Sequence, residues 1–198
     1  DGSVRRWICG SHPRKGYTNS RQKIAMHAAA TKAAGVGCFI YYNTTESEWW
    51  YAREKYPESI ARDENGNTIN AYKGMSYPDS QACWLMNSDP ETPFGKDLAD
   101  QAQEMLQAYP GIAGFFWDVY GRSYRFDFAH DDGITMVNNR PAYYPEFMYE
   151  RMMEQKIGPL LHKSGRFITC NKPTMITGCK GIDGIMAKED TPDEDVPA

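Results

Sequence analysis

A regular alternation of short apolar runs with helix-like segments constrains the fold more than any other feature. The strongest run is Ile112–Val119 (IAGFFWDV), in which Asp118 is the single charged residue. Continuous apolar runs of this length are typical of strands that are buried on both faces of a parallel sheet. The runs expected to form strands are Arg6–Gly10, Val36–Tyr42, Ala82–Met86, Ile112–Val119, Arg166–Cys170 and Ile182–Ala187.

Helical patterns separate these runs. Asn19–Ala34 is rich in alanine, begins with residues that cap helices and is followed by Gly35, a common helix stop. The other expected helices are Glu46–Lys55, Pro93–Tyr109 with Asp89 as its N-cap, and Tyr144–Lys163 with a break at Gly158-Pro159. Two long irregular segments, Thr44–Asp79 and Tyr120–Pro141, are expected to be functional or disordered, as loops of this length usually are.

This order predicts an α/β fold with a parallel sheet and helices outside it. A doubly wound sheet and a (β/α)8 TIM-type barrel both fit the alternation. The barrel is favoured because no Gly-rich phosphate loop follows a strand and because polar residues recur where strands end, which is where barrels build active sites. A complete barrel needs about 250 residues. With about six strands in 198 residues, we expect an incomplete barrel that a missing C-terminal segment or a partner chain closes.

Residues 1–190 are expected to be the partial catalytic barrel, and 191–198 an acidic tail or the start of a missing segment. The net charge of −4 and the lack of a basic stripe argue against nucleic acid as a partner. The apolar runs are far shorter than the roughly 20 residues of a membrane helix. No CxxC pair occurs among the five cysteines, so a structural zinc site is not expected. No other metal or cofactor is expected either. The absence of an initiator Met indicates a processed start, and we expect an extracellular or periplasmic location.

Asp118 is the best catalytic candidate. A carboxylate at the rim of an apolar strand usually has a partner or a chemical purpose, although a structural Asp that binds loop amides is the simpler interpretation. Glycoside hydrolysis needs two carboxylates, one protonated and one ionised. Glu189 and Asp190, which follow the last expected strand, are the first choices for the general acid, unless they belong to a solvated acidic tail.

Several polar and aromatic residues near the expected strand ends are candidates for contacting a substrate. Asp131 and Asp132 either hold a ligand or form a turn at Asp132-Gly133. Aromatic rings, including the Trp49-Trp50 pair, either stack on sugars or pack in the core. The complete set of expected binding residues is Trp84, Trp117, Tyr120, Arg122, Asp127, His130, Asp131, Asp132, Asn171 and Lys172.

At GFFWDVYG, followed by DFAHDDGITMVNNRPAYYP, the chain resembles an uncharacterised family of bacterial glycoside-hydrolase-like barrels. More distantly, it is similar to the α-galactosidase clan of retaining enzymes. The likeness spans roughly Val36 to Asp190. It implies that Asp118 is the nucleophile and that the acid/base lies near Asp190. Phe116 occupies the place where the clan usually has a lysine.

A glycoside hydrolase that acts on oligo- or polysaccharides is therefore the expected function. Three other functions fit parts of the sequence. Lys172 or Lys188 suits a Schiff-base aldolase or lyase, because a barrel can desolvate an amine and lower its pKa. His12 and His130 with nearby aspartates suit a metal-dependent hydrolase. A barrel that only binds glycans, or that supports a larger assembly, is the non-catalytic alternative.

Overall fold

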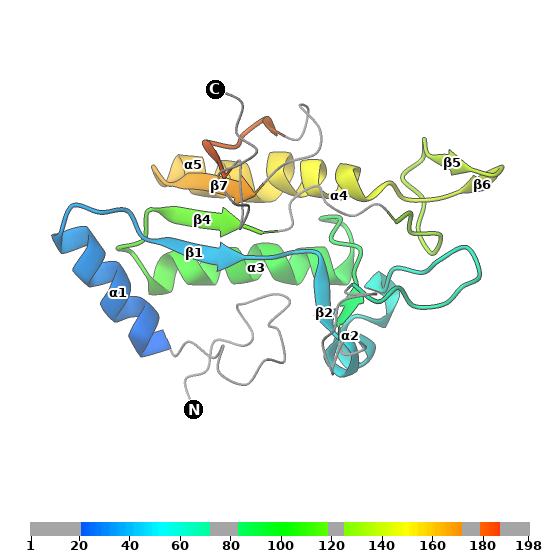
Figure 1. Cartoon of the computed structure of the whole chain (residues 1–198), viewed down its shortest axis with the longest axis horizontal. Helices are drawn as coiled ribbons and strands as arrows, with labels where there is room; N and C mark the ends of the chain where they lie inside the picture. Colours follow the sequence, from blue (N-terminus) through cyan, green and yellow to red (C-terminus); the bar gives the residue numbers. More distant parts are fainter. Residues whose placement is uncertain (1–20, 72–82, 119–124, 172–178, 187–198) are drawn as a thin grey trace, which may run out of the picture.

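The computed structural model describes residues 21–71, 83–118, 125–171 and 179–186 (Figure 1). At its centre is a four-stranded parallel sheet with the order β1-β4-β7-β8. These strands are β1 (Phe39–Tyr42), β4 (Gly114–Trp117), β7 (Phe167–Asn171) and β8 (Gly184–Met186). Pairing is in register, so that Tyr42, Trp117 and Cys170 lie side by side. The predicted α/β fold with a parallel sheet is confirmed.

Helices connect the parallel strands. The chain enters through α1 (Arg21–Ala33), which ends where Gly35 takes a φ of 71°. Between β1 and β4 lies α3 (Pro93–Ala108), and between β4 and β7 lie α4 (Pro145–Met152), the π-helical η3 (Met153–Ile157) and α5 (Gly158–Lys163). Figure 1 shows α3 and the α4–α5 segment running alongside the strands. None of the helices in the described ranges is long and apolar enough to cross a membrane.

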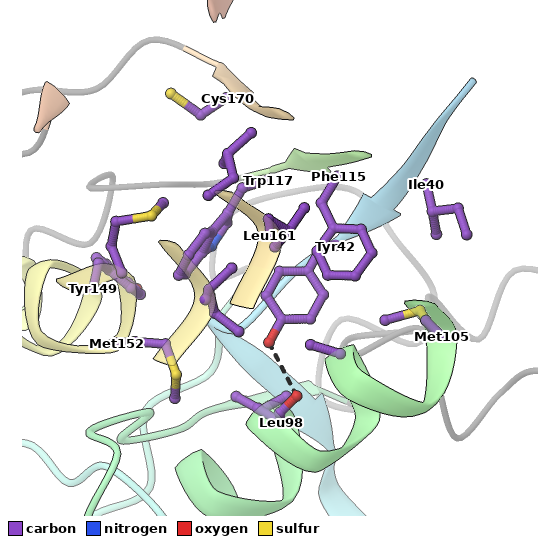
Figure 2. Close-up of a cluster of buried hydrophobic side chains, with 14 of the residues drawn as sticks. Ile40, Tyr42, Leu98, Met105, Phe115, Trp117, Tyr149, Met152, Leu161 and Cys170 are labelled. Carbon is purple, nitrogen blue, oxygen red and sulfur yellow. Dashed lines mark hydrogen bonds between the residues drawn. The ribbon is translucent and has the colours of Figure 1, made fainter. Parts of the chain in front are cut away.

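The core lies between one face of the sheet and these helices (Figure 2). The ring of Tyr42 stacks on Phe115 with centroids 5.1 Å apart and meets Trp117 edge-on at 5.3 Å. The Tyr42 hydroxyl also donates a hydrogen bond of 3.2 Å to the backbone carbonyl of Leu98 in α3. These rings are fully buried, so they join two strands and a helix in one packed unit.

The opposite face of the sheet carries a different set of side chains. Residues alternate between the faces of a strand, which puts Phe39, Tyr41, Phe116 and Phe167 on this side. Phe39 is 39% exposed and Phe167 is 53% exposed. In a (β/α)-barrel this face points inward and is covered by the other strands. The exposed rings therefore mark the surface that a closed barrel would bury.

The prediction that Ala82–Met86 is a strand of the parallel sheet is wrong. The observed strand, β3 (Cys83–Leu85), pairs antiparallel with β2 (Glu46–Glu48). Isolated bridges from Asn70 to Trp84 and from Ile60 to Met86 add further pairing, so these residues belong to a small separate layer. A five-residue apolar run carries no information about strand direction, which is why the prediction failed.

The strand count and one helix also need correction. The described ranges contain four parallel strands, not the expected six, and Arg6–Gly10 lies outside them. The expected helix Glu46–Lys55 is two elements, the strand β2 and the helix α2 (Trp49–Lys55). A short 3-10 helix, η2 (Pro57–Ser59), follows α2.

Within the expected irregular segment Tyr120–Pro141 the structure places a hairpin. Its strands are β5 (Met136–Val137) and β6 (Arg140–Pro141). Asn138 and Asn139 between them have φ angles of 51° and 60°. A two-residue turn with both φ angles positive matches the twist of the flanking strands, and asparagine tolerates this conformation well.

At Gly158-Pro159, where a kink or break is expected, the helical segment is not interrupted but changes from π-helix to α-helix. The amide of Gly158 donates to the carbonyl of Met153, five residues back, which is a π-type bond. A Cβ at position 158 would lie 2.8 Å from that carbonyl oxygen, so glycine is required for this close approach. Pro159 has no amide hydrogen, so the bond that it would donate in a regular helix is missing.

Gly114→Ala is expected to destabilise the fold by about 3 kcal/mol, because the added Cβ would overlap the backbone carbonyl of Phe167 in β7. Urea unfolding monitored by tryptophan fluorescence measures this loss. Gly37→Ala is the matched control, since its Cβ would meet only the Ala113 and Phe39 side chains, at 3.2 and 3.4 Å. The control should stay within about 1 kcal/mol of the parent. Equal stability of the two variants would contradict the packing described for β4 and β7.

Candidate active site

Asp118 lies at the carboxyl end of β4, in the middle of the parallel sheet. Its amide donates a 2.8 Å hydrogen bond to the carbonyl of Tyr42, which extends the ladder by one residue. Because the strands are in register, Asn43 and Asn171 occupy the equivalent places at the ends of β1 and β7. In three adjacent strands, the residue that follows the paired Tyr42, Trp117 and Cys170 is thus polar.

Two side chains hold the Asp118 carboxylate. The Tyr41 hydroxyl donates to Oδ2, and the side-chain amide of Asn171 donates to Oδ1. Burial, and then the hydrogen bond to Asp118, raise the pKa of Tyr41 well above its ordinary value, so the hydroxyl keeps its proton. Asn171 is buried, whereas Asp118 is partly exposed. The carboxylate is therefore fixed in orientation while part of it faces solvent.

A second layer of contacts positions Tyr41. The amide nitrogen of Asn43 lies 3.4 Å from the Tyr41 hydroxyl oxygen and donates to Glu46 Oε1 at 3.0 Å. Asn43 Oδ1 accepts from the amide of Thr45 at 2.8 Å, which shapes the turn between β1 and β2. Asn43 and Glu46 are both buried. A continuous set of polar contacts thus runs from β2 to Asp118.

Trp117 and Cys170, the residues before Asp118 and Asn171, lie on the opposite, helix-facing side of the sheet. Trp117 is fully buried on the helix-facing side of the sheet, so in the described structure it packs in the core. Cys170 is buried in the same layer, and burial followed by the nearby Cys179 raises the pKa of its thiol to about 11. A thiol with this pKa stays protonated at neutral pH, which makes it a poor nucleophile.

Asp127 forms a second polar centre. It is fully buried, and its Oδ1 accepts from the backbone amides of Arg62 at 3.1 Å and Ala129 at 2.9 Å. Its Oδ2 accepts from the side-chain amide of Asn87 at 3.1 Å and lies 2.5 Å from Nδ1 of His130. The carboxylate is occupied by protein donors and ties the segment after β4 to the loop after β3.

Both ring nitrogens of His130 face acceptors. Nδ1 meets Asp127, and Nε2 lies 2.7 Å from the backbone carbonyl of Glu58. A neutral imidazole has a single N–H, so both bonds form only in the protonated ring. Burial opposes protonation, but the hydrogen bond to Asp127, its charge, the Glu58 carbonyl and the charge of Asp89 outweigh burial, and the pKa of His130 is raised.

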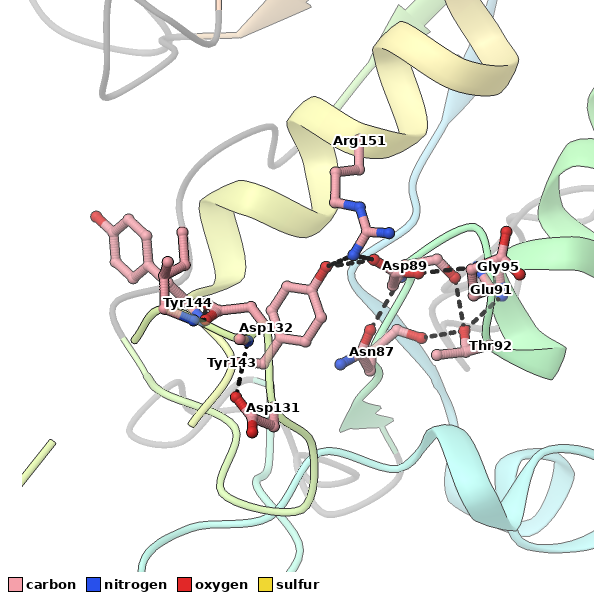
Figure 3. A network of polar contacts seen from close by, with 12 residues as sticks. Asn87, Asp89, Glu91, Thr92, Gly95, Asp131, Asp132, Tyr143, Tyr144 and Arg151 are labelled. Atoms are coloured by element: carbon pink, nitrogen blue, oxygen red, sulfur yellow. Dashed lines mark hydrogen bonds and ion pairs between the residues drawn. The ribbon is translucent and has the colours of Figure 1, made fainter. Parts of the chain in front are cut away.

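Asp131 and Asp132 form turns. Asp131 is exposed and accepts from the amide of Gly133 at 2.8 Å (Figure 3). Asp132 accepts from Thr135 through both its amide and its hydroxyl, each at 2.7 Å, and from the amide of Tyr144 at 2.9 Å. Burial opposes ionisation of Asp132, but these bonds outweigh it and lower its pKa. The described contacts match the turn interpretation of these two residues.

Asp89 does not cap α3, so that prediction is wrong. Thr92 is the cap, and its hydroxyl accepts from the amide of Gly95 at 3.0 Å. Asp89 instead forms a 2.6 Å ion pair with Arg151 of α4 and accepts from the hydroxyl of Tyr143 (Figure 3). Arg151 lies inside an expected helix, and nothing in its sequence context pointed to a buried carboxylate.

Of the remaining candidate residues, one lies in the described ranges and the others lie outside them. Trp84 is half-buried in β3. In the described ranges no group of three or more His, Cys, Asp or Glu side chains is arranged to hold a metal ion. The candidates outside the described residues are His12, Tyr120, Arg122, Lys172, Lys188, Glu189 and Asp190.

His130→Gln should cost about 2 kcal/mol of stability below pH 6, because a charged hydrogen-bond pair is lost. A raised pKa in the folded state means that this stabilisation is fully present below the ordinary histidine pKa of about 6.5 and is lost as pH rises through the raised value. The difference from the parent should therefore shrink between pH 6 and 9 in urea unfolding. Asp131→Asn, an exposed neighbour, should show no such trend. A difference that grows with pH would contradict the protonated ring.

Comparison with known proteins rests on structure, since the sequence matches no protein-family model and no curated protein. The chain is similar to a cycloisomaltooligosaccharide glucanotransferase from Paenibacillus sp., complexed with cycloisomaltoheptaose, with a TM-score of 0.57 at 12% identity. The match covers 84% of this chain and 25% of that one. A pullulanase type I from Bacillus subtilis str. 168, complexed with maltose, gives a TM-score of 0.44 at 15% identity over 88% of this chain and 22% of that one.

The match to the glucanotransferase shows a shared fold. Over most of its length this chain matches part of a TIM-barrel glycoside-hydrolase structure, and it spans about a quarter of the glucanotransferase chain. At 12% identity this match shows the fold alone, and the glucanotransferase is not described as an α-galactosidase, so it gives no particular support to that clan.

Proposed function

We propose that this chain is part of a glycoside hydrolase that cleaves O-glycosidic bonds in oligo- or polysaccharides by a retaining mechanism, with Asp118 as the nucleophile. The observation that carries the proposal is the setting of Asp118. It is partly exposed at the carboxyl edge of the sheet, and each oxygen of its carboxylate accepts one hydrogen bond from a neighbouring strand. Barrel enzymes place their catalytic groups at this edge.

The chemistry assigned to Asp118 uses this geometry directly. One carboxylate oxygen attacks the anomeric carbon as the bond to the leaving oxygen breaks, which gives a covalent glycosyl-enzyme. Tyr41 and Asn171 hold the carboxylate plane, so little orientational freedom is lost in the attack. Water then attacks the same carbon, and the bond to Asp118 breaks.

The second carboxylate in this proposal is Asp190 or Glu189. Both follow β8, which is separated from β4 only by β7. Neighbouring strands lie about 4.8 Å apart, so the ends of β4 and β8 are roughly 10 Å apart. A retaining pair needs about 5–5.5 Å between carboxyl groups. This residue would protonate the leaving oxygen and later take a proton from water.

The nature of the substrate and the place of action are also proposals. The matched glucanotransferase is complexed with cycloisomaltoheptaose, which supports oligosaccharides as the first compounds to test. An Asp nucleophile at the carboxyl end of a barrel strand, here β4, remains the proposed mechanism, although in the described ranges β4 is not the fourth parallel strand that the likeness to the α-galactosidase clan assumed. An extracellular or periplasmic location is proposed because polymeric sugars are found there.

A non-catalytic glycan-binding barrel is the second candidate. One observation favours it: both Asp118 oxygens already accept protein hydrogen bonds, as a structural carboxylate would. A carboxylate has about four lone-pair sites, however, so the two bonds leave acceptor capacity for a ligand or an attack. Turnover, and not geometry, separates these two candidates.

The intact parent chain and its Asp118→Asn variant are assayed on a panel of aryl glycosides. The variant should hydrolyse none of them, because an amide cannot act as the nucleophile. Circular dichroism and unfolding midpoints check that the variant folds. Asp118→Gly with sodium azide is the sharper test, since azide can enter the vacated space and attack the anomeric carbon. A glycosyl azide of inverted configuration is the expected product. Hydrolysis that survives in Asp118→Asn would remove this residue from the mechanism, and a parent without turnover would favour glycan binding.

Tyr41→Phe should lower kcat roughly 10- to 100-fold with a smaller effect on KM, because it removes one hydrogen bond to the carboxylate and leaves the ring. Steady-state kinetics on the best aryl glycoside of the panel measure the split. Tyr144→Phe is a control in which a hydroxyl is lost far along the chain, at the N-terminus of α4. An unchanged kcat for Tyr41→Phe would mean that Tyr41 does not position the reacting group.

A further inference from the structure

Two adjacent tryptophans at the start of α2 are unusually exposed. Trp49 is 40% exposed and Trp50 is 47% exposed. The half-buried Trp84 of β3 lies beside Trp49, with ring centroids 6.4 Å apart and ring planes inclined by 50°. We call Trp49, Trp50 and Trp84 the tryptophan platform. Large aromatic rings favour burial, so their joint exposure calls for a functional explanation.

The platform rests on a rigid base. Trp50 meets Tyr51 edge-on at 5.5 Å, Tyr51 meets Tyr56 at 5.7 Å, and Tyr56 meets Phe94 of α3 at 5.4 Å. The Tyr56 hydroxyl also donates a 2.7 Å hydrogen bond to Asp97 of α3. This aromatic row links α2 to α3. The exposed rings are held by packed neighbours and do not belong to a frayed end.

The chemistry around the platform suits a sugar better than an apolar protein surface. The Arg53 guanidinium lies 5.5 Å from the centroid of the Trp49 ring, and Arg53, Glu54 and Lys55 are exposed on the same helix. Charged side chains thus interrupt the apolar area. A pyranose ring has an apolar C–H face for stacking and a rim of hydroxyls that charged groups can bind. This combination matches exposed aromatic rings bordered by charged side chains.

The platform lies at the same end of the sheet as Asp118. Trp49 directly follows β2, and Ser47 of β2 pairs with Trp84. The contacts from Glu46 through Asn43 and Tyr41 lead from β2 to Asp118. Figure 1 shows β2 and α2 beyond the end toward which the arrows of β1 and β4 point. A glycan chain at Asp118 therefore has this platform on its side of the molecule.

We propose that the tryptophan platform binds pyranose rings of an oligosaccharide, other than the ring that reacts at Asp118. The proposal rests on the proposed function for its substrate class. Stacking on Trp50, and on the face of Trp49 that Arg53 does not cover, would hold the glycan, while Arg53 would bind its hydroxyls. Binding at such a remote site lowers the dissociation constant of long glycans more than that of short ones.

The test is titration of the full chain with isomaltoheptaose and with maltoheptaose, in which calorimetry and tryptophan fluorescence measure binding. At least one of the two should bind, and Trp50→Ala or Trp49→Ala should raise its Kd roughly 10-fold, as the loss of one stacking ring implies. Trp50→Phe, which keeps a flat ring, should lose less. Met26→Ala on α1 removes an apolar side chain that is even more exposed, at 63%, and should leave the Kd unchanged.

The outcomes separate this proposal from the hydrolase proposal. Asp118→Asn should keep the platform's affinity, whether or not the parent turns over glycosides. A Kd unchanged in both tryptophan variants would overturn the platform and leave the role of Asp118 standing. Lack of binding of either sugar by the folded parent would overturn it as well. Binding that depends on Trp50 in a parent without turnover would support the platform and count against the hydrolase.

Discussion

The in-register pairing of β1, β4 and β7 is the constraint on which the rest of the structure depends. It stacks Tyr42, Phe115 and Trp117 in one buried layer against α3, α4 and α5. The same pairing makes the next residue of each strand meet its neighbours at one edge. Packing in the core and the grouping of Asp118 with Asn171 and Tyr41 therefore share one cause. A shift of a strand by one residue would disturb both.

The long insertions after β1 and β4 are held by charge as well as by packing. Asp127 and Asp89 are buried carboxylates that bind His130 and Arg151. The Asp89–Arg151 pair joins segments distant in the sequence, and Asp127 does so through its bonds to the Arg62 amide and to Asn87. These residue types often mark ligand sites, yet here the partners come from the chain itself. The oxygens of Asp127 and Asp89 accept hydrogen bonds from protein donors and so hold loops in place, whereas Asp118 is partly exposed to solvent.

Sequence patterns predicted the strand that ends at Asp118, because IAGFFWDV is long, apolar and bounded by a helix on one side. They failed at Ala82–Met86, where a short apolar run pairs in a direction that no local pattern specifies. Tyr41 was missed because it sits in an apolar run, where alternation decides which of two adjacent tyrosines is buried. Asp89 pairs with Arg151, and Asp127 with Arg62 and Asn87, all 40 or more residues away, and pairing over such distances leaves no local trace.

The π-helical turn at Met153–Ile157 has a consequence for how this chain can change in length. A π turn accommodates one more residue than an α turn, and each residue of an α-helix adds about 100° of rotation. Deleting one residue from this turn would leave about the number of residues that an α turn needs, so the faces of α5 would keep nearly the same orientation. Leu161, which is fully buried, would stay in the core. A deletion inside α4 would instead rotate the residues that follow by about 100°. The segment between β4 and β7 therefore has one place at which the loss of a residue is tolerated.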